Sequence, residues 1–157
     1  MLCAGEILSQ WVVVKFGGSS VSSRTKCQVI IDVVNNHLKQ GHKVLVVHSA
    51  AQGLTNLLAD RCQHNTPAFA AFSEILQALA QDLEVPMSVA NEPLDTLKAL
   101  DLLAQLDVYQ QASLMALGEL ATHRVLMAFL AKHGQPQSLD PKEWLGSSSE
   151  DKRHAEA

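Results

Sequence analysis

The apolar positions follow two different periods in the first fifty residues of the chain. Residues 11–16 (Trp-Val-Val-Val-Lys-Phe) are a short apolar run rich in β-branched side chains, which predicts a buried strand. From Ser22 to Gln40 apolar residues recur every three or four positions, which predicts a helix with one buried face, and Gly41 follows as a stop. Residues 43–48 are almost continuously apolar, as expected of a parallel strand covered on both faces. This order predicts a right-handed βαβ unit, and therefore an α/β fold with a mainly parallel sheet.

The rest of the chain is rich in alanine and leucine and reads mainly as helices. The predicted elements are a helix ending near Gln63, helices at 67–83 and 91–106, a long helix at 110–133, a third strand at 135–139 and a helical turn at 140–144. The helices at 67–83 and 91–106 have two interpretations, a hairpin used in dimer contact or simple cover for the sheet. We favour cover for the sheet.

Composition and charge narrow the class of protein. At 157 residues, with 47% hydrophobic and 18% charged residues, the chain suits one globular domain. We place that domain at 11–145, after an extension at 1–10 and before a polar tail at 146–157 that we expect to be disordered. The net charge of −4, with no basic stripe, argues against nucleic-acid binding, and no apolar run approaches the roughly 20 residues of a membrane span.

The cysteines and histidines carry no metal or disulfide signature. Cys3, Cys27 and Cys62 are odd in number and far apart, which indicates reduced thiols. The N-terminus lacks the pattern of a secretory signal, so we expect a cytoplasmic protein. The seven histidines form no His-x-His or His-Glu-x-x-His group, and we predict no metal ligands.

A glycine turn directly after the first strand is the first candidate site. Gly17 and Gly18 allow the backbone to turn sharply and approach a ligand, and Ser19 and Ser20 then lead into the helix. Free N–H groups, the positive end of the helix and the ammonium group of Lys15 together predict an anion site. The order of lysine and glycines excludes a Walker A loop and a dinucleotide-binding fingerprint. The alternative is a plain β–α turn with a solvated lysine.

The loop after the second strand repeats this arrangement. Ser49, Gly53 and Thr55 give it small residues, a glycine and hydroxyls at a helix start, although capping alone would explain Thr55. Both loops follow the carboxyl ends of strands, where open α/β sheets bind ligands. A serine-hydrolase elbow at His48-Ser49 is not favoured, because Val47 and Ala51 stand where the motif requires glycine beside the strained serine.

A third candidate is Glu119, which follows Gly118 inside an apolar helical stretch. A carboxylate in such a place is costly unless it finds a cationic or hydrogen-bonding partner. It could therefore act as a receptor for a cationic group. The alternative is an exposed glutamate on the polar side of the helix.

These three segments together resemble the aspartokinases of the amino acid kinase family. Residues 15–21 (Lys-Phe-Gly-Gly-Ser-Ser-Val) resemble the family signature, with serine where threonine is often found, and residues 45–56 and 115–121 resemble its second and third motifs in family order. The resemblance covers Trp11 to Leu145. The opening Trp-Val-Val-x-Lys-Phe-Gly-Gly is similar to aspartokinases fused to a diaminopimelate decarboxylase.

The resemblance implies a three-layer αβα sandwich and assigns roles to the candidate residues. The roles it implies are Lys15 in catalysis; Lys15, Gly17, Gly18, Ser19 and Ser20 on the phosphates of ATP; and Ser49, Gly53, Thr55 and Glu119 on L-aspartate, with Glu119 at the α-ammonium group. The activity implied is transfer of the γ-phosphoryl group of ATP to the β-carboxylate of L-aspartate with Mg²⁺. This reaction is the first step towards lysine, threonine and methionine.

The family's second kinase half, with its Gly-Arg-Gly-Gly-Ser-Asp-like stretch, does not appear in this sequence. We therefore expect the amino-terminal lobe alone, inactive in isolation, with a homodimer or a complementing C-terminal half as possible partners. Two alternatives stay open. One is another amino acid kinase, such as one acting on glutamate, and the other is an inactive lobe that serves as a binding or interaction module.

Overall fold

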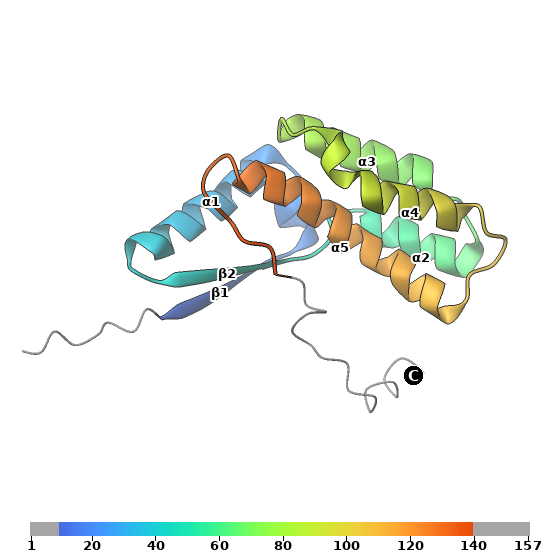
Figure 1. The fold of residues 1–157 in the computed structure, drawn as a ribbon, viewed down its shortest axis with the longest axis horizontal. Helices are drawn as coiled ribbons and strands as arrows, with labels where there is room; N and C mark the ends of the chain where they lie inside the picture. Colours follow the sequence, from blue (N-terminus) through green and yellow to red (C-terminus); the bar gives the residue numbers. More distant parts are fainter. Residues whose placement is uncertain (1–9, 140–157) are drawn as a thin grey trace, which may run out of the picture.

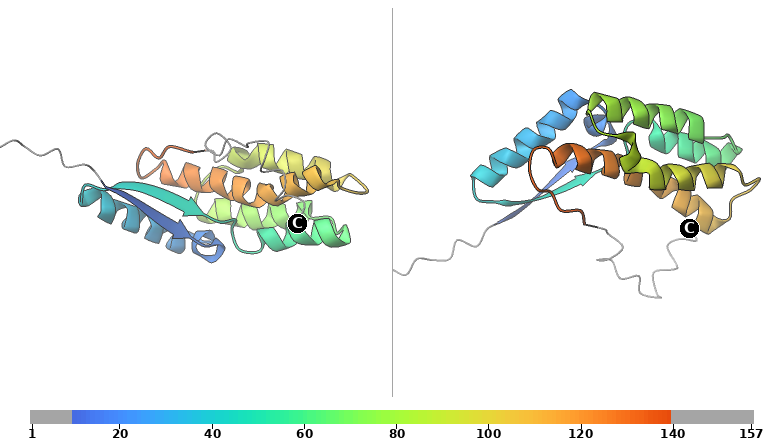
Figure 2. Two further views of the ribbon diagram at one scale, coloured as in Figure 1. Left: turned by 90° about the horizontal axis from the view of Figure 1, so that it is seen from below. Right: turned by 45° about the horizontal axis from the view of Figure 1, so that its top comes forward.

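The computed structural model describes residues 10–139, which form a βαβ unit at one end and a group of helices at the other (Figure 1). The βαβ unit consists of β1 (Trp11–Phe16), the short 3-10 helix η1 (Gly18–Val21), α1 (Arg24–Lys39) and β2 (Lys43–His48). The helical part consists of α2 (Leu54–His64), α3 (Phe69–Asp82), the 3-10 helix η2 (Met87–Ala90), α4 (Asn91–Asp101) and α5 (Val108–Leu130). Helix α5 runs from the helical end back towards the strands (Figures 1 and 2).

The two strands are parallel, as predicted, and pair from Trp11 with Lys43 to Phe16 with His48. Their inner face includes Phe16 and Val46, which pack against the core. The outer face carries Trp11 and Val13, exposed by 60% and 63%, and Val47, exposed by 41%. The prediction that the second strand is covered on both faces is therefore wrong within residues 10–139, because no described segment covers the outer face.

Helix α5 is the centre of the core. Eight of its residues are buried, and it packs against α2, α3 and α4. Among the described residues it alone has the length and mean hydropathy, 1.2, that a membrane span would also need, but its burial between other helices is typical of a core helix. It begins at Val108, two residues before the predicted start, because Asp107 and Gln110 form a reciprocal capping box.

A buried ion pair ties three helices together around α2. Arg61, only 2% exposed, donates from Nε to the Asp101 carboxylate at 3.0 Å and from Nη2 to the carbonyl oxygens of Leu100 and Leu103. The other oxygen of Asp101 accepts from the backbone N–H groups of Ala68 and Phe69 at the start of α3. The guanidinium of Arg61 and both carboxylate oxygens of Asp101 therefore have hydrogen-bond partners, which offset the cost of burying the two charges.

The observed structure differs from the sequence predictions in three places. Helix α4 ends at Asp101 rather than 106, as Asp101 turns towards Arg61. Helices α3 and α4 pack mainly against other helices, namely each other, α2, α5 and η2, so their interpretation as cover for the sheet is wrong. The third strand predicted at 135–139 does not form; this segment has no ladder partner and contains Pro136, which has no N–H to donate. The helical turn at 140–144 and both terminal segments, except for residue 10, lie outside the described residues.

Candidate functional site

The two predicted loops meet at the carboxyl ends of β1 and β2. The N–H of Ser49 donates to the carbonyl oxygen of Phe16 at 3.1 Å, and the N–H of Gln52 donates to that of Gly18 at 3.2 Å. A Cβ atom on Gly18 would lie 2.4 Å from the carbonyl oxygen of Ala50, closer than real Cβ atoms approach oxygen. Glycine at 18 is thus required by the contact between the loops, while glycine at 17 has open space around it.

The first loop presents unused hydrogen-bond donors. Within residues 10–139, the backbone N–H groups of Gly17, Gly18 and Ser19 have no acceptor, and Lys15 has no ion-pair partner. Lys15 is exposed at the end of β1, two residues before the turn. Consecutive free N–H groups beside an ammonium group are the chemistry of a phosphate-binding loop.

Helix α1 does not contribute its positive end to this loop, contrary to the sequence interpretation. The 3-10 helix η1 separates the glycines from α1, which begins only at Arg24. The N–H of Arg24 donates to the carboxylate of Asp82, the last residue of α3. The protein's own anion therefore occupies the start of α1, and any bound phosphate would depend on the turn and on Lys15.

The second loop places its candidates around a left-handed glycine. Gly53 has a φ of +94° and is the N-cap of α2, a conformation that L side chains rarely adopt. The side chain of Thr55 is exposed in the first turn of α2 and makes no capping hydrogen bond among the described residues. The interpretation of Thr55 as a helix cap is therefore wrong among the described residues, and the Thr55 side chain is exposed near half-buried Ser49.

Helix α5 is fastened to this second loop along one stripe. The Oγ1 of Thr122 accepts a hydrogen bond from the N–H of Ala51 at 2.9 Å, and a Cβ atom on Gly118 would lie 3.0 Å from that of Ala50. The imidazole of His123 lies 3.3 Å from that of His48. At 100° per residue, Glu119 falls between Thr122 and His123 around the helix, one turn earlier. Its carboxylate is exposed, as in the alternative interpretation, and has no partner within residues 10–139, so the cost of burying a carboxylate does not apply to it.

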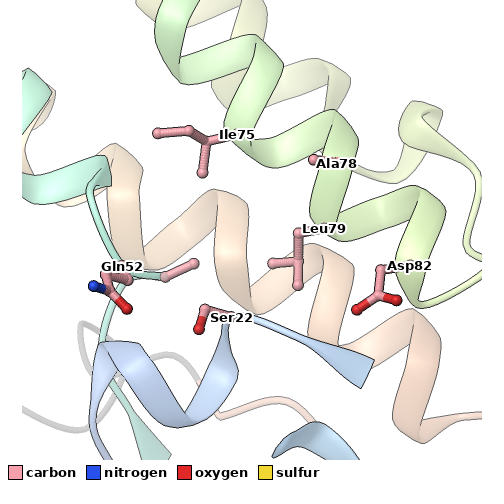
Figure 3. A pocket seen from close by; sticks show the side chains of 7 residues that line it. Ser22, Gln52, Ile75, Ala78, Leu79 and Asp82 are labelled. Carbon is pink, nitrogen blue, oxygen red and sulfur yellow. The ribbon is translucent and has the colours of Figure 1, made fainter. Parts of the chain in front are cut away.

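A pocket of about 610 Å³ opens on the α3 side of the same two loops (Figure 3). Its lining includes Ser22, Gln52 and Asp82, with Ile75 and Leu79 supplying apolar surface. No sequence pattern indicates this pocket, because its lining residues come from three separate parts of the chain. Asp82 already accepts from Arg24, so the pocket has no unpaired acid to mark it as a catalytic centre.

Other reactive groups do not add to the site. Burial raises the pKa of the Cys27 thiol to about 11, and burial also raises the pKa of Cys62, so neither is a ready nucleophile at neutral pH. Within residues 10–139, no group of three or more His, Cys, Asp or Glu side chains could hold a metal ion. The groups that the two loops and α5 offer for chemistry are free backbone N–H donors, one ammonium group, hydroxyls and one exposed carboxylate.

Comparison with known proteins establishes the family and the fold of the chain. Residues 10–155 match the amino acid kinase family. The chain belongs to the amino acid kinase family. Its structure is similar to that of aspartokinase III from E. coli, solved in complex with aspartate and ADP in the R-state, with a TM-score of 0.63 at 24% sequence identity. At that identity the likeness establishes the fold. No curated protein sequence matches the chain.

The amino acid kinase fold of this chain is partial with respect to that structure. The match covers 80% of this chain and 29% of the aspartokinase III chain. The family, the α/β class and the aspartokinase-like fold predicted from the sequence are therefore confirmed. The roles of Lys15, Glu119 and the loop residues remain predictions.

Proposed function

We propose that this chain forms the part of an aspartate kinase that holds L-aspartate and the phosphates of ATP. The single observation that carries the proposal is the joining of three separate segments at one edge of the sheet. The loop after β1 is hydrogen-bonded to the loop after β2, and the stripe of α5 that bears Glu119 is hydrogen-bonded to the second loop. Nothing in the local sequence requires Gly118 and Thr122, which lie on either side of Glu119 along α5, to contact a loop more than sixty residues earlier.

The first loop is proposed to hold the phosphates. The free N–H groups of Gly17, Gly18 and Ser19 supply donors, Lys15 supplies a positive charge, and the hydroxyls of Ser19 and Ser20 lie on the same turn. The open space at Gly17 leaves room for an anion to approach the backbone. In phosphoryl transfer such groups act by positioning the phosphate and offsetting the charge that develops on its oxygens.

The second loop and α5 are proposed to hold the amino acid. An α-ammonium group needs an anion, which Glu119 offers without a competing partner among the described residues. The carboxylates need hydroxyl and N–H donors, which Ser49 and Thr55 can supply on either side of Gly53. The β-carboxylate would then face Lys15 and the phosphate loop across the contact between the loops.

The complete reaction needs groups beyond those described here. Mg²⁺ would neutralise charge on the transferred phosphoryl group, but the described residues contain no cluster suited to hold it. Since the chain spans 29% of the aspartokinase III structure, we propose that a further kinase segment, in the same or another polypeptide, supplies the metal ligands and the nucleotide pocket.

The phosphate loop is tested by Lys15→Ala. A charge-assisted contact is worth roughly 1.5–3 kcal/mol, so the substitution is expected to weaken binding of tripolyphosphate about tenfold or more. Titration of the full chain followed by NMR measures this, and the shifts should centre on Gly17 to Ser20. Lys39→Ala, at the far end of α1, is the matched control and is expected to change nothing. Equal binding by the wild type and the Lys15 variant would return this turn to a plain β–α connection.

The amino-acid site is tested by Glu119→Gln, which removes the charge and keeps the shape. Binding of L-aspartate is expected to fall about tenfold, since the ammonium group loses its anion. Asp95→Asn, an equivalent change at an exposed position on α4, is the control. L-Glutamate is titrated in parallel, and tighter binding of glutamate than aspartate would replace the proposed substrate. Unchanged aspartate binding in the Glu119 variant would exclude the proposed role of this carboxylate.

A further inference from the structure

Two histidines and a serine form a chain of contacts that ends on the second loop. The Nδ1 atom of His48 lies 3.0 Å from the carbonyl oxygen of Ser49, and its Nε2 atom lies 3.3 Å from Nδ1 of His123. The Nε2 atom of His123 lies 2.7 Å from Oγ of Ser138. Three segments far apart in the sequence, at 48–49, 123 and 138, thus converge beside the candidate amino-acid site.

The two imidazoles meet edge to edge in one plane. Their ring planes differ by only 7°, and their centroids are 5.5 Å apart. That separation is nearly the sum of the 3.3 Å between the nitrogens and the two ring radii, so the nitrogens point at each other along the line of centres. Face-to-face stacking would require a much shorter distance between centroids. This geometry is that of an in-plane N–H···N hydrogen bond.

The carbonyl at one end fixes the protons along the chain. A carbonyl oxygen only accepts, so Nδ1 of His48 must carry a proton. In the neutral ring, Nε2 of His48 is then an acceptor, and Nδ1–H of His123 donates to it. Nε2 of neutral His123 in turn accepts from the hydroxyl of Ser138. When both rings are neutral, these three contacts favour the Nδ1–H tautomer of His48 and of His123, with a single direction of donation.

We propose that His123 is a positioning residue for the amino-acid site and acts through His48 on Ser49. The backbone of Ser49 is held on both sides, since its N–H donates to Phe16 and its carbonyl accepts from His48. Together with the hydrogen bond from Ala51 to Thr122, the contacts of His48 and His123 hold the second loop in a defined position on α5. These hydrogen bonds would hold the Ser49 hydroxyl at a set distance from Glu119. The proposed role of His123 rests on the function proposed above.

The hydrogen-bond chain is tested first without any ligand. Long-range ¹H–¹⁵N NMR spectra of the full chain at about pH 8 distinguish the two tautomers of a neutral imidazole. We expect both His48 and His123 to appear as Nδ1–H tautomers, and His123→Ala to shift the ring nitrogens of His48 and the amides of Ser49 to Gly53. An Nε2–H tautomer at His48, or loop amides that do not respond to His123→Ala, would overturn the proposal.

The consequence for binding is tested with a graded pair of variants. His123→Ala is expected to weaken L-aspartate binding about three- to tenfold, the effect of one lost hydrogen bond, and to leave tripolyphosphate binding unchanged. His123→Asn keeps an N–H at the place of Nδ1 and is expected to restore most of the affinity. His42→Ala breaks a similar pair with His37, 3.4 Å apart at the other end of β2, and is the control.

These results separate the two proposals. If the wild type binds no aspartate, the proposed function fails, while the tautomers still decide whether the histidine chain exists. If His123→Ala and His123→Asn weaken aspartate binding equally, or if tripolyphosphate binding falls with aspartate binding, His123 supports the fold in general and its positioning role is excluded.

Discussion

Arg61→Met is expected to lower the free energy of unfolding by about 3–5 kcal/mol, because removal of one member of a buried ion pair leaves the other charge uncompensated. Arg61 and Asp101 are 2% and 8% exposed, and Arg61 also donates to two backbone carbonyls at the end of α4. Methionine keeps most of the volume but none of these bonds. Chemical denaturation followed by circular dichroism measures the change.

Arg124→Met provides the matched control for this prediction. Arg124 pairs with Glu92 at 2.8 Å, but the two side chains are 47% and 66% exposed. Ion pairs in water contribute about 0–1 kcal/mol, so this substitution should scarcely alter the denaturation midpoint. Equal losses in the two variants would show that the buried cluster around Arg61 does not hold α2, α3 and α4 together.

Gly18→Ala is expected to cost about 2–3 kcal/mol of folding free energy, since its Cβ atom would lie 2.4 Å from the carbonyl oxygen of Ala50. Both sides of this contact are backbone, so neither can swing away as a flexible side chain would. The two loops would have to separate, and the bond from Gln52 to Gly18 would be lost. Thermal unfolding should show the loss directly.

Gly17→Ala is the natural comparison, because the two glycines are neighbours with different surroundings. Nothing lies within 4 Å of a Cβ atom at Gly17, whose φ of −74° suits any residue. Its stability should stay within about 0.5 kcal/mol of the wild type. A Gly17 variant as unstable as the Gly18 variant would mean that the turn itself, rather than the contact with Ala50, requires glycine.

Local pattern predicted the βαβ unit well, because period and glycine punctuation act over a few residues. β2 was predicted at its observed bounds, and the helix after Ser22 differs from α1 by two residues or fewer at each end. The early end of α4 was missed because it depends on Arg61, forty residues away in the sequence. The capping box at Asp107 and Gln110, in contrast, was readable in the sequence and was overlooked.

The candidate site shows the same division. The glycines, Lys15 and the second loop could be named from the sequence because each carries a local chemical signal. The sequence does not explain why glycine is needed at positions 18 and 118, because both glycines lie close to Ala50, which contacts them only in the folded structure. The partnership of His48 with His123 links positions 75 residues apart, and the sequence offered His48 only as a neighbour of Ser49. Contacts between residues far apart in the chain produce no repeating pattern in the sequence, so sequence analysis cannot find them.

The outer face of the sheet points to a second physical role for Lys15, which it would share with Lys43. Each strand has one unpaired edge within residues 10–139, and exposed edges beside Trp11 and Val13 are templates for pairing between copies. Lys43 lies 5.7 Å from the ring centroid of Trp11, and Lys15 stands on the same face two residues beyond Val13. Lysine side chains on such a surface disfavour pairing between copies, so we expect the ammonium group proposed to meet phosphate also to oppose aggregation of the chain.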